Sequence, residues 1–167
     1  MPCLSLAPRL ALAALSFSAG AAQALCLPAA CNCTVATTSV AFGSYNPLAF
    51  GNTDSTGSVK VSCGGVAGLL IPFNIALSAG SSASYAGRRL RSGGNSLAYN
   101  LYTDASYATL WGDGSSATQV VSSSVTLDVL GLSPAQSFVV YGRIPGRQTA
   151  AVPGSYSDTI SVTLTYY

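Results

Sequence analysis

The residues that could carry catalysis in this chain are few. Its 167 residues include no His and no Glu, and the five acidic residues are all Asp. Without His, the chain lacks the side chain that titrates nearest neutral pH, a common metal ligand and the usual base of a nucleophile pair. The only Lys, Lys60, falls on the polar face of a predicted strand, where solvation disfavours a role as base for a serine. We therefore expect no catalytic residues and no cofactor.

Two sequence features could bind a ligand. The segment Trp111-Gly-Asp113-Gly114 combines an aromatic ring, a carboxylate and flexible backbone, as a calcium or sugar loop would. Calcium takes six to eight oxygen ligands, and only Asp104 adds a carboxylate nearby, so a turn with a packed Trp is the simpler interpretation and no metal is predicted. A small basic cluster is interpreted as a solvated loop that could contact an acidic polysaccharide: Arg88, Arg89 and Arg91.

The first 24 residues predict a secretory signal peptide. Arg9 precedes a short apolar run, and Ala22-Gln-Ala24 has the small-residue pattern of a cleavage site. The apolar run is well short of the ~20 residues that cross a bilayer, so no membrane span is expected. Residues 25–167 would form the mature chain as a single domain. The net charge of +2 offers no basic field for nucleic acid.

Four cysteines remain after the predicted cleavage: Cys26, Cys31, Cys33 and Cys63. An even number in an oxidising compartment indicates two disulfides, for which three connectivities exist. Cys33–Cys63 is favoured because each residue sits on a strand-like run, and Cys26–Cys31 would then close a small loop. A metal site at Cys31-Asn-Cys33 is the alternative, but zinc sites usually pair two such units, and the chain has no second pair.

The elements that must position these residues are strands. Large apolar residues alternate with small or polar ones in several runs separated by Gly and Ser clusters: 58–63, 71–78, 97–101, 125–129, 138–144 and 158–167. This pattern favours an all-β fold, an antiparallel β-sandwich. Pro72 suggests that its strand is an edge or carries a bulge. The final run, 158–167, carries one charge and no Pro, so either it is internal or its open edge is meant for another chain.

Eight segments in order give the chain a family resemblance: Cys33-Thr-Val, 41–47, 57–63, Arg89-Leu90, 97–104, 111–114, 140–144 and 154–166. Together they resemble the spore coat protein U domain, found in subunits of archaic, Csu-type chaperone–usher pili of Gram-negative bacteria. The resemblance implies an immunoglobulin-like sandwich, incomplete because it lacks its final strand. A hydrophobic groove beside the C-terminal strand would be filled first by a periplasmic pilus chaperone and then by the N-terminal extension of a neighbouring pilus subunit. The outer-membrane usher is the third partner that the resemblance implies.

The resemblance also assigns roles to particular residues. Cys33–Cys63 looks like the family's disulfide. The acceptor groove for the donor strand would be lined by Ile160, Val162, Leu164 and Tyr166. The implied function is that of an exported, structural and adhesive subunit without catalysis, placed on the cell surface for attachment and biofilm formation.

One departure from the family pattern concerns the segment before Cys33. Residues 25–32 are few, contain Pro28 and would be tied by Cys26–Cys31, so they make a poor donor strand. This favours a subunit that accepts a strand without giving one, as at a fibre tip. The alternatives are a self-complete secreted sandwich that binds carbohydrate through Trp111, and a structural coat protein of resting cells.

Overall fold

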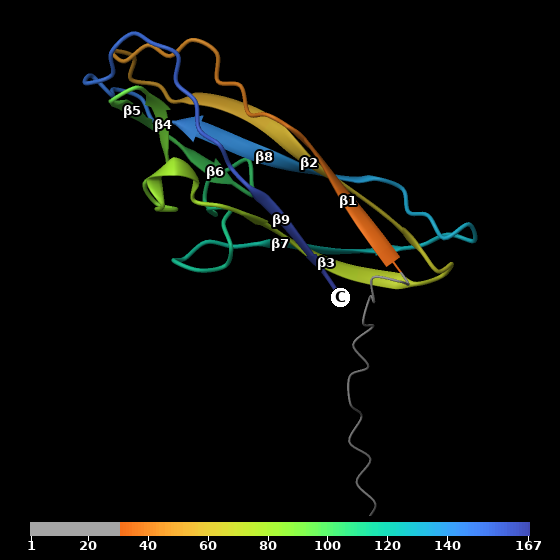
Figure 1. Ribbon diagram of the computed structural model, residues 1–167. Coiled ribbons are helices and arrows are strands. Elements are labelled where there is room, and N and C mark those ends of the chain that lie inside the picture. The colour runs from red at the N-terminus through yellow and green to blue at the C-terminus, as the bar shows by residue number, and fades with distance from the viewer. Residues whose placement is uncertain (1–30) are drawn as a thin grey trace, which may run out of the picture.

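The alternating sequence runs fold into two facing antiparallel sheets, as the computed structural model shows (Figure 1). The structure describes residues 31–167; the predicted signal peptide 1–24 and Cys26 lie outside the described residues.

Nine strands and one short 3-10 helix make up the described part of the chain. One sheet has the order β1 (Cys31–Thr38), β2 (Thr53–Gly65), β8 (Gln136–Ile144), β6 (Asn100–Tyr102), and the other has the order β7 (Val121–Thr126), β3 (Leu70–Leu77), β9 (Val162–Tyr166). A hairpin of β4 (Arg89–Ser92) and β5 (Asn95–Ala98) lies at one end, next to the helix η1 (Gly80–Ser82).

The core lies between the two sheets, and β3 shows why. Its odd-numbered side chains from Ile71 to Leu77 are at most 2% exposed, whereas the even-numbered ones face outward and are partly exposed. Across the core, Val59 and Val61 of β2 are equally buried. Successive side chains of a strand point to opposite faces, so each strand gives one row to the core. The predicted antiparallel β-sandwich is confirmed.

Pro72 lies in a central strand, contrary to the sequence prediction, because β3 pairs with both β7 and β9. The backbone N–H of Tyr167 donates to the carbonyl of Pro72 over 3.1 Å. The N and C=O of one strand residue face the same neighbour, so the donor that Pro72 lacks faces the end of β9. The missing hydrogen bond therefore falls where the ladder stops.

Three of the predicted strand ranges differ clearly from the observed strands. The run 97–101 is divided at Tyr99, where the chain leaves the β4–β5 hairpin and joins the first sheet. The run 125–129 ends as a strand at Thr126, and Val129, 92% exposed, belongs to a turn closed by Asp128. The final strand begins only at Val162 and not at Asp158.

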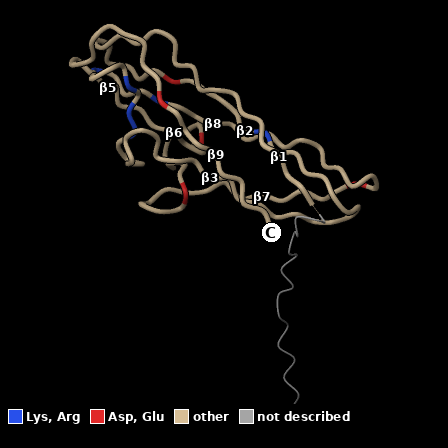
Figure 2. Tube along the Cα trace, in the orientation of Figure 1, with Lys and Arg blue, Asp and Glu red and all other residues tan. Residues whose placement is uncertain are grey.

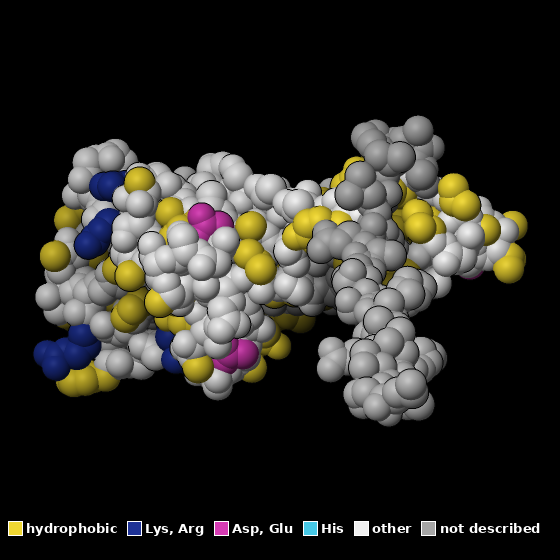
Figure 3. All heavy atoms as spheres, turned by 90° about the horizontal axis from the view of Figure 1, so that it is seen from below, with side chains coloured by type: hydrophobic (Ala, Val, Ile, Leu, Met, Phe, Trp, Pro, Cys, Tyr) yellow, Lys and Arg dark blue, Asp and Glu magenta, His cyan; other side chains and the backbone are white. Residues whose placement is uncertain are grey.

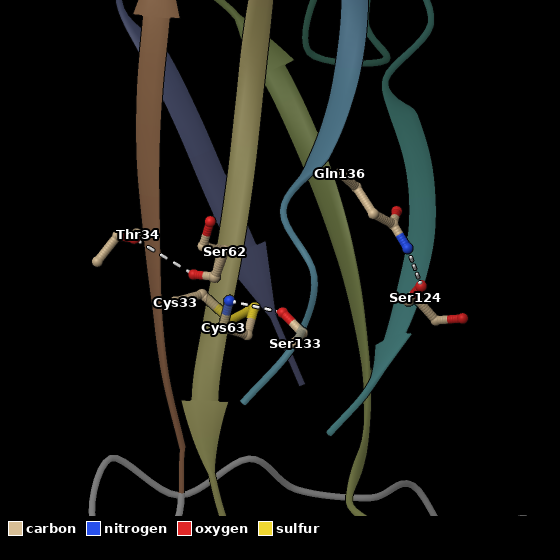
Figure 4. Close-up of a disulfide and its surroundings, with 7 residues drawn as sticks. All are labelled: Cys33, Thr34, Ser62, Cys63, Ser124, Ser133 and Gln136. Carbon is tan, nitrogen blue, oxygen red and sulfur yellow. Dashed lines mark hydrogen bonds between the residues drawn. A yellow bond between two sulfur atoms is a disulfide. The ribbon is translucent and has the colours of Figure 1, made fainter. Parts of the chain in front are cut away.

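Cys33 and Cys63 form the predicted disulfide, directly across the β1–β2 ladder (Figure 4). The bond closes a loop with a sequence separation of 30 residues. We expect the C33S/C63S double variant to lose roughly 3–4 kcal/mol of unfolding free energy, because its unfolded chain is less constrained. Guanidinium unfolding of the oxidised protein and of this variant measures the loss. Equal midpoints would contradict the structural role.

Cys31 is also disulfide-bonded. Its expected partner, Cys26, lies outside the described residues, so that pairing stays a prediction.

Charged side chains are sparse over the two sheets (Figure 2). Within residues 31–167, a partly exposed ion pair joins Arg143 of β8 to Asp54 of β2, with two guanidinium nitrogens 2.7 Å from the two carboxylate oxygens. Within residues 31–167, no helix is long and apolar enough to cross a membrane.

Candidate functional site, a groove between β1 and β9

The two sheets are joined along one side of the sandwich and parted along the other. On the joined side, the Gln136 side chain of β8 donates a hydrogen bond to the carbonyl of Ser124 over 3.0 Å (Figure 4). It also accepts one from the hydroxyl of Ser123 over 3.0 Å. On the other side lie β1 and β9, each the last strand of its sheet. Among the described residues, no strand pairs with the outer edge of either one.

The inward face of β1 is incompletely covered. Val35 lies directly opposite Val61 in the antiparallel ladder, so both side chains point to the same face. Val61 is fully buried, whereas Val35 is 37% exposed. Thr37, opposite the buried Val59, is exposed as well. An apolar side chain on the core side of a sheet that still meets water marks an opening in the sandwich.

The same holds for the C-terminal segment. Every second side chain from Tyr156 to Tyr166 is turned inward and partly buried, whereas the residues between them are exposed. The four residues predicted from the sequence lie in this row and pack against the core: Ile160, Val162, Leu164 and Tyr166. Their neighbours on β3 are almost fully buried, so this row also lacks a cover on its outer side.

A groove runs between these two exposed rows. One part, of about 190 Å³, is bordered by Thr37 and Thr38 of the β1 side and by Ile160 and Val162 of the β9 side. Its floor consists of core side chains from both sheets: Val59, Leu77, Leu101 and Val140. Leu164 and Tyr166 continue the inward row along β9 without bordering this part. The acceptor role of the four residues stays a prediction.

A wider cleft of about 780 Å³ continues the groove beyond the ends of the strands. It lies between the chain that follows β1 and the chain that approaches β9, residues 39–47 and 151–158. Val40, Phe42 and Leu90 line both parts. The sequence interpretation missed these residues: the inward side chains of β1 are odd-numbered, so its alternation does not extend to Val40 and Phe42, which lie beyond the end of the strand.

Asp158 lines the groove where its two parts meet. One carboxylate oxygen accepts the backbone N–H groups of Ser81 and Thr159, over 3.0 and 2.9 Å, and the other accepts the hydroxyl of Tyr99 over 2.7 Å. Gly80 permits this close approach, because a Cβ there would overlap the carboxylate.

Burial of Asp158 works against its ionisation, but the hydrogen bonds from Ser81, Tyr99 and Thr159 hold its pKa below the ordinary value. Because its folded pKa is depressed, Asp158 stabilises the fold above its unfolded-state pKa, and this contribution is lost as the pH falls through the folded value.

Behind this carboxylate, Arg88 is fully buried rather than part of a solvated basic loop, which corrects the sequence interpretation. Its guanidinium donates to the carbonyls of Ser78 and Trp111 and to the side chain of Asn100, over 2.7 to 3.2 Å. Burial lowers the pKa of Arg88. Arg89 and Arg91 are exposed on β4, as expected.

The Trp111 segment has no exposed ring for a sugar to stack on. Trp111 is 0% exposed, and its indole N–H donates to the carbonyl of Ile75 over 3.0 Å. The predicted packed Trp is confirmed, and the carbohydrate alternative that relied on it is wrong.

The two nearby carboxylates serve their own loops. Asp104 accepts bonds from the side chain of Ser106 and from the backbone of Thr109 and Ala108, which together lower its pKa to about 2. The Asp113 carboxylate likewise accepts hydrogen bonds from the backbone N–H and the hydroxyl of Ser115. Among residues 31–167, no group of three or more potential metal ligands occurs.

Comparison with known proteins adds a family and a fold. The model of the Spore Coat Protein U domain matches residues 20–163. No curated protein matches the chain. A similar fold occurs in the crystal structure of the CsuC–CsuE chaperone–tip adhesion subunit pre-assembly complex from the archaic chaperone–usher Csu pili of Acinetobacter baumannii, with 21% identity and a TM-score of 0.52. The alignment covers 80% of this chain and 39% of that chain, so this chain spans well under half of that protein's length.

Proposed function

This chain belongs to the spore coat protein U domain family, and on that premise we propose that it is an exported structural subunit of a chaperone–usher pilus. The fold shared with a chain of the Csu chaperone–subunit complex supports this proposal. Residues 1–24 would direct export and residues 25–167 would form the single mature domain. The protein would then pass through the periplasm to the surface of a Gram-negative cell.

The observation that carries the proposal is the groove between β1 and β9. Among residues 31–167, no strand pairs with the outer edges of β1 and β9, and an apolar floor lies between them. An extended segment of another chain could add hydrogen bonds to an edge and place alternate side chains into the groove, which is β-augmentation. In this reading the sandwich is incomplete, and the inserted strand supplies the missing cover.

The partners follow from strand addition. A periplasmic pilus chaperone would cover the groove before assembly, the outer-membrane usher would receive the complex, and a neighbouring pilus subunit would then replace the chaperone's strand. Contacts of this head-to-tail kind do not close on themselves, so they build fibres.

We place the subunit at the fibre tip. Because β1 already begins at Cys31, only residues 25–30 would precede it after the predicted cleavage, which is too few for a donor strand. Gold-labelled antibody against this protein should mark one end of each pilus. Labelling along the whole fibre would contradict the tip position and leave the acceptor groove in place.

Exposed apolar loops support a role in attachment and biofilm formation. The β2–β3 and β7–β8 loops lie together at the end where β1 begins, joined by the bond from the Gly65 N–H to the Gly131 carbonyl. Gly131 has a positive φ of 72° and approaches Gly65 too closely for a side chain. The loops expose Val66, Val129, Leu130 and Leu132, and Leu70 at the start of β3 is exposed beside them. Exposed apolar side chains gather at this end of the molecule (Figure 3). Contiguous exposed apolar groups typically mark interaction sites.

The proposal is tested by crosslinking in the periplasm. The full chain is co-expressed with the pilus chaperone of the same bacterium and carries a photo-crosslinking phenylalanine analogue at position 35, on the incompletely covered inward face of β1. The matched control carries the analogue at position 122, on the outward face of β7. We expect a one-to-one adduct with the chaperone from position 35 alone. Equal crosslinking from both positions would overturn the proposal, and so would a stable monomer that forms no adduct with the chaperone.

A further inference from the structure

The row of inward side chains along the C-terminal segment contains one charge. Its members alternate from Tyr156 to Tyr166 and are otherwise aromatic or aliphatic, with Asp158 the exception. Asp158 is partly buried and borders both parts of the groove. In the same inward row it precedes the apolar residues Ile160 and Val162. A strand laid in the groove would therefore meet a carboxylate at one defined position.

The carboxylate of Asp158 has room for another hydrogen bond. An ionised carboxylate offers about four acceptor positions. The backbone N–H groups of Ser81 and Thr159 donate to one oxygen, and the hydroxyl of Tyr99 donates to the other. The side chain of Ser81 also acts on this carboxylate, but its hydroxyl donates to the carbonyl of Arg89 over 3.2 Å. Water can serve the remaining position while the groove is open. An inserted strand would displace that water, and a buried acceptor left without a donor is costly.

From this geometry we infer that Asp158 determines the specificity of the groove, by requiring a hydrogen-bond-donating side chain at one end of the inserted strand. This inference rests on the proposed function. Residues directly opposite each other on neighbouring strands share a face. Apolar side chains therefore belong opposite Tyr166, Leu164, Val162 and Ile160, and a donor such as Ser belongs at the fifth inward position, opposite Asp158.

A series of fluorescent peptides tests this requirement on the oxidised wild-type protein. Each peptide is a 12-residue strand with Val at five inward positions, Thr at the outward positions and Lys at both ends. Ser or Ala replaces one inward Val at a time, and fluorescence anisotropy gives the dissociation constant. At one of the two terminal inward positions, the peptide with Ser should bind about 10- to 100-fold more tightly than the peptide with Ala. At the three central positions, Ser should bind no better than Ala.

The Asp158→Asn variant gives a nearly isosteric check. The amide oxygen must stay on the side of the two backbone N–H groups, which places the NH₂ group where the free acceptor was. The Ser preference should then disappear, whereas Asp113→Asn, in an exposed loop outside the groove, should keep it.

The possible outcomes distinguish the strand-acceptor role of the groove from the role of Asp158 within it. Failure of every peptide to bind wild-type protein would count against the groove as a strand acceptor and so against the proposed function. Binding in which Ser and Ala are equivalent at every position would overturn the role of Asp158 and leave the proposed function standing. The peptide series on wild-type protein decides this even if Asp158→Asn does not fold.

Discussion

Replacing Arg88 by Ala should lower the free energy of unfolding by about 4–6 kcal/mol, because several buried acceptors would lose their donor at once. Arg88 is 0% exposed, and its guanidinium serves the carbonyls of Ser78 and Trp111 and the amide oxygen of Asn100. A buried acceptor without a partner costs about 1–3 kcal/mol. The emptied volume of the long side chain adds a cavity cost.

The guanidinium also links the core to the groove. Ser78 directly follows β3 and also pairs with Ser161, just before β9, whereas Asn100 begins β6 in the other sheet. One planar group thus holds parts of both sheets. Lys offers donors on a single nitrogen and cannot reproduce this fork. We therefore expect Arg88→Lys to recover only part of the loss.

Arg89→Ala is the matched control, because Arg89 is the next residue and is exposed on β4. Its unfolding free energy should stay within about 0.5 kcal/mol of wild type, as for most surface substitutions. Urea unfolding of the three variants and the wild type, followed by circular dichroism, makes the comparison. If Arg88→Ala and Arg89→Ala were equally stable, the buried network would have no structural role.

The sequence predicted the sheets well because their signal is local. Alternation of large apolar and polar residues marks a half-buried strand wherever it occurs, and the inward row from Ile160 to Tyr166 was read directly from it. The favoured Cys33–Cys63 pair required only that two strand-like runs be neighbours. Both predictions depend on residues within one strand or on one pairing, so no long-range geometry was needed.

The rest of the site depends on contacts between distant segments. Arg88 stands beside two other arginines in the sequence, and nothing local indicates that it turns inward to meet Ser78 and Trp111. Asp158 could be read as the start of a strand, but not as a carboxylate held by Tyr99, 59 positions away. Pro72 suggested an edge because the sequence cannot show where β9 ends.

Fusing a donor strand after Tyr167 should raise the unfolding free energy by about 5 kcal/mol. Because β9 ends at Tyr166, a short Gly/Ser turn could return the added strand along its open edge. Four apolar side chains placed in the groove would contribute roughly 6–12 kcal/mol. Ordering the strand removes part of this gain. The guanidinium midpoint of the fused protein, compared with that of the unfused protein, measures the difference.

Two controls separate groove filling from a general effect of extra residues. A fused strand with Pro at its two central positions cannot donate to the ladder there and should stabilise little.

On the acceptor side, Val162→Asp would place a charge in the groove, whereas Thr163→Asp would place it on the exposed outer face of β9. The fused strand should stabilise Thr163→Asp as much as wild type and Val162→Asp far less. Equal gains in both variants would mean that the strand binds elsewhere, and no gain in wild type would mean that the sandwich is complete without it.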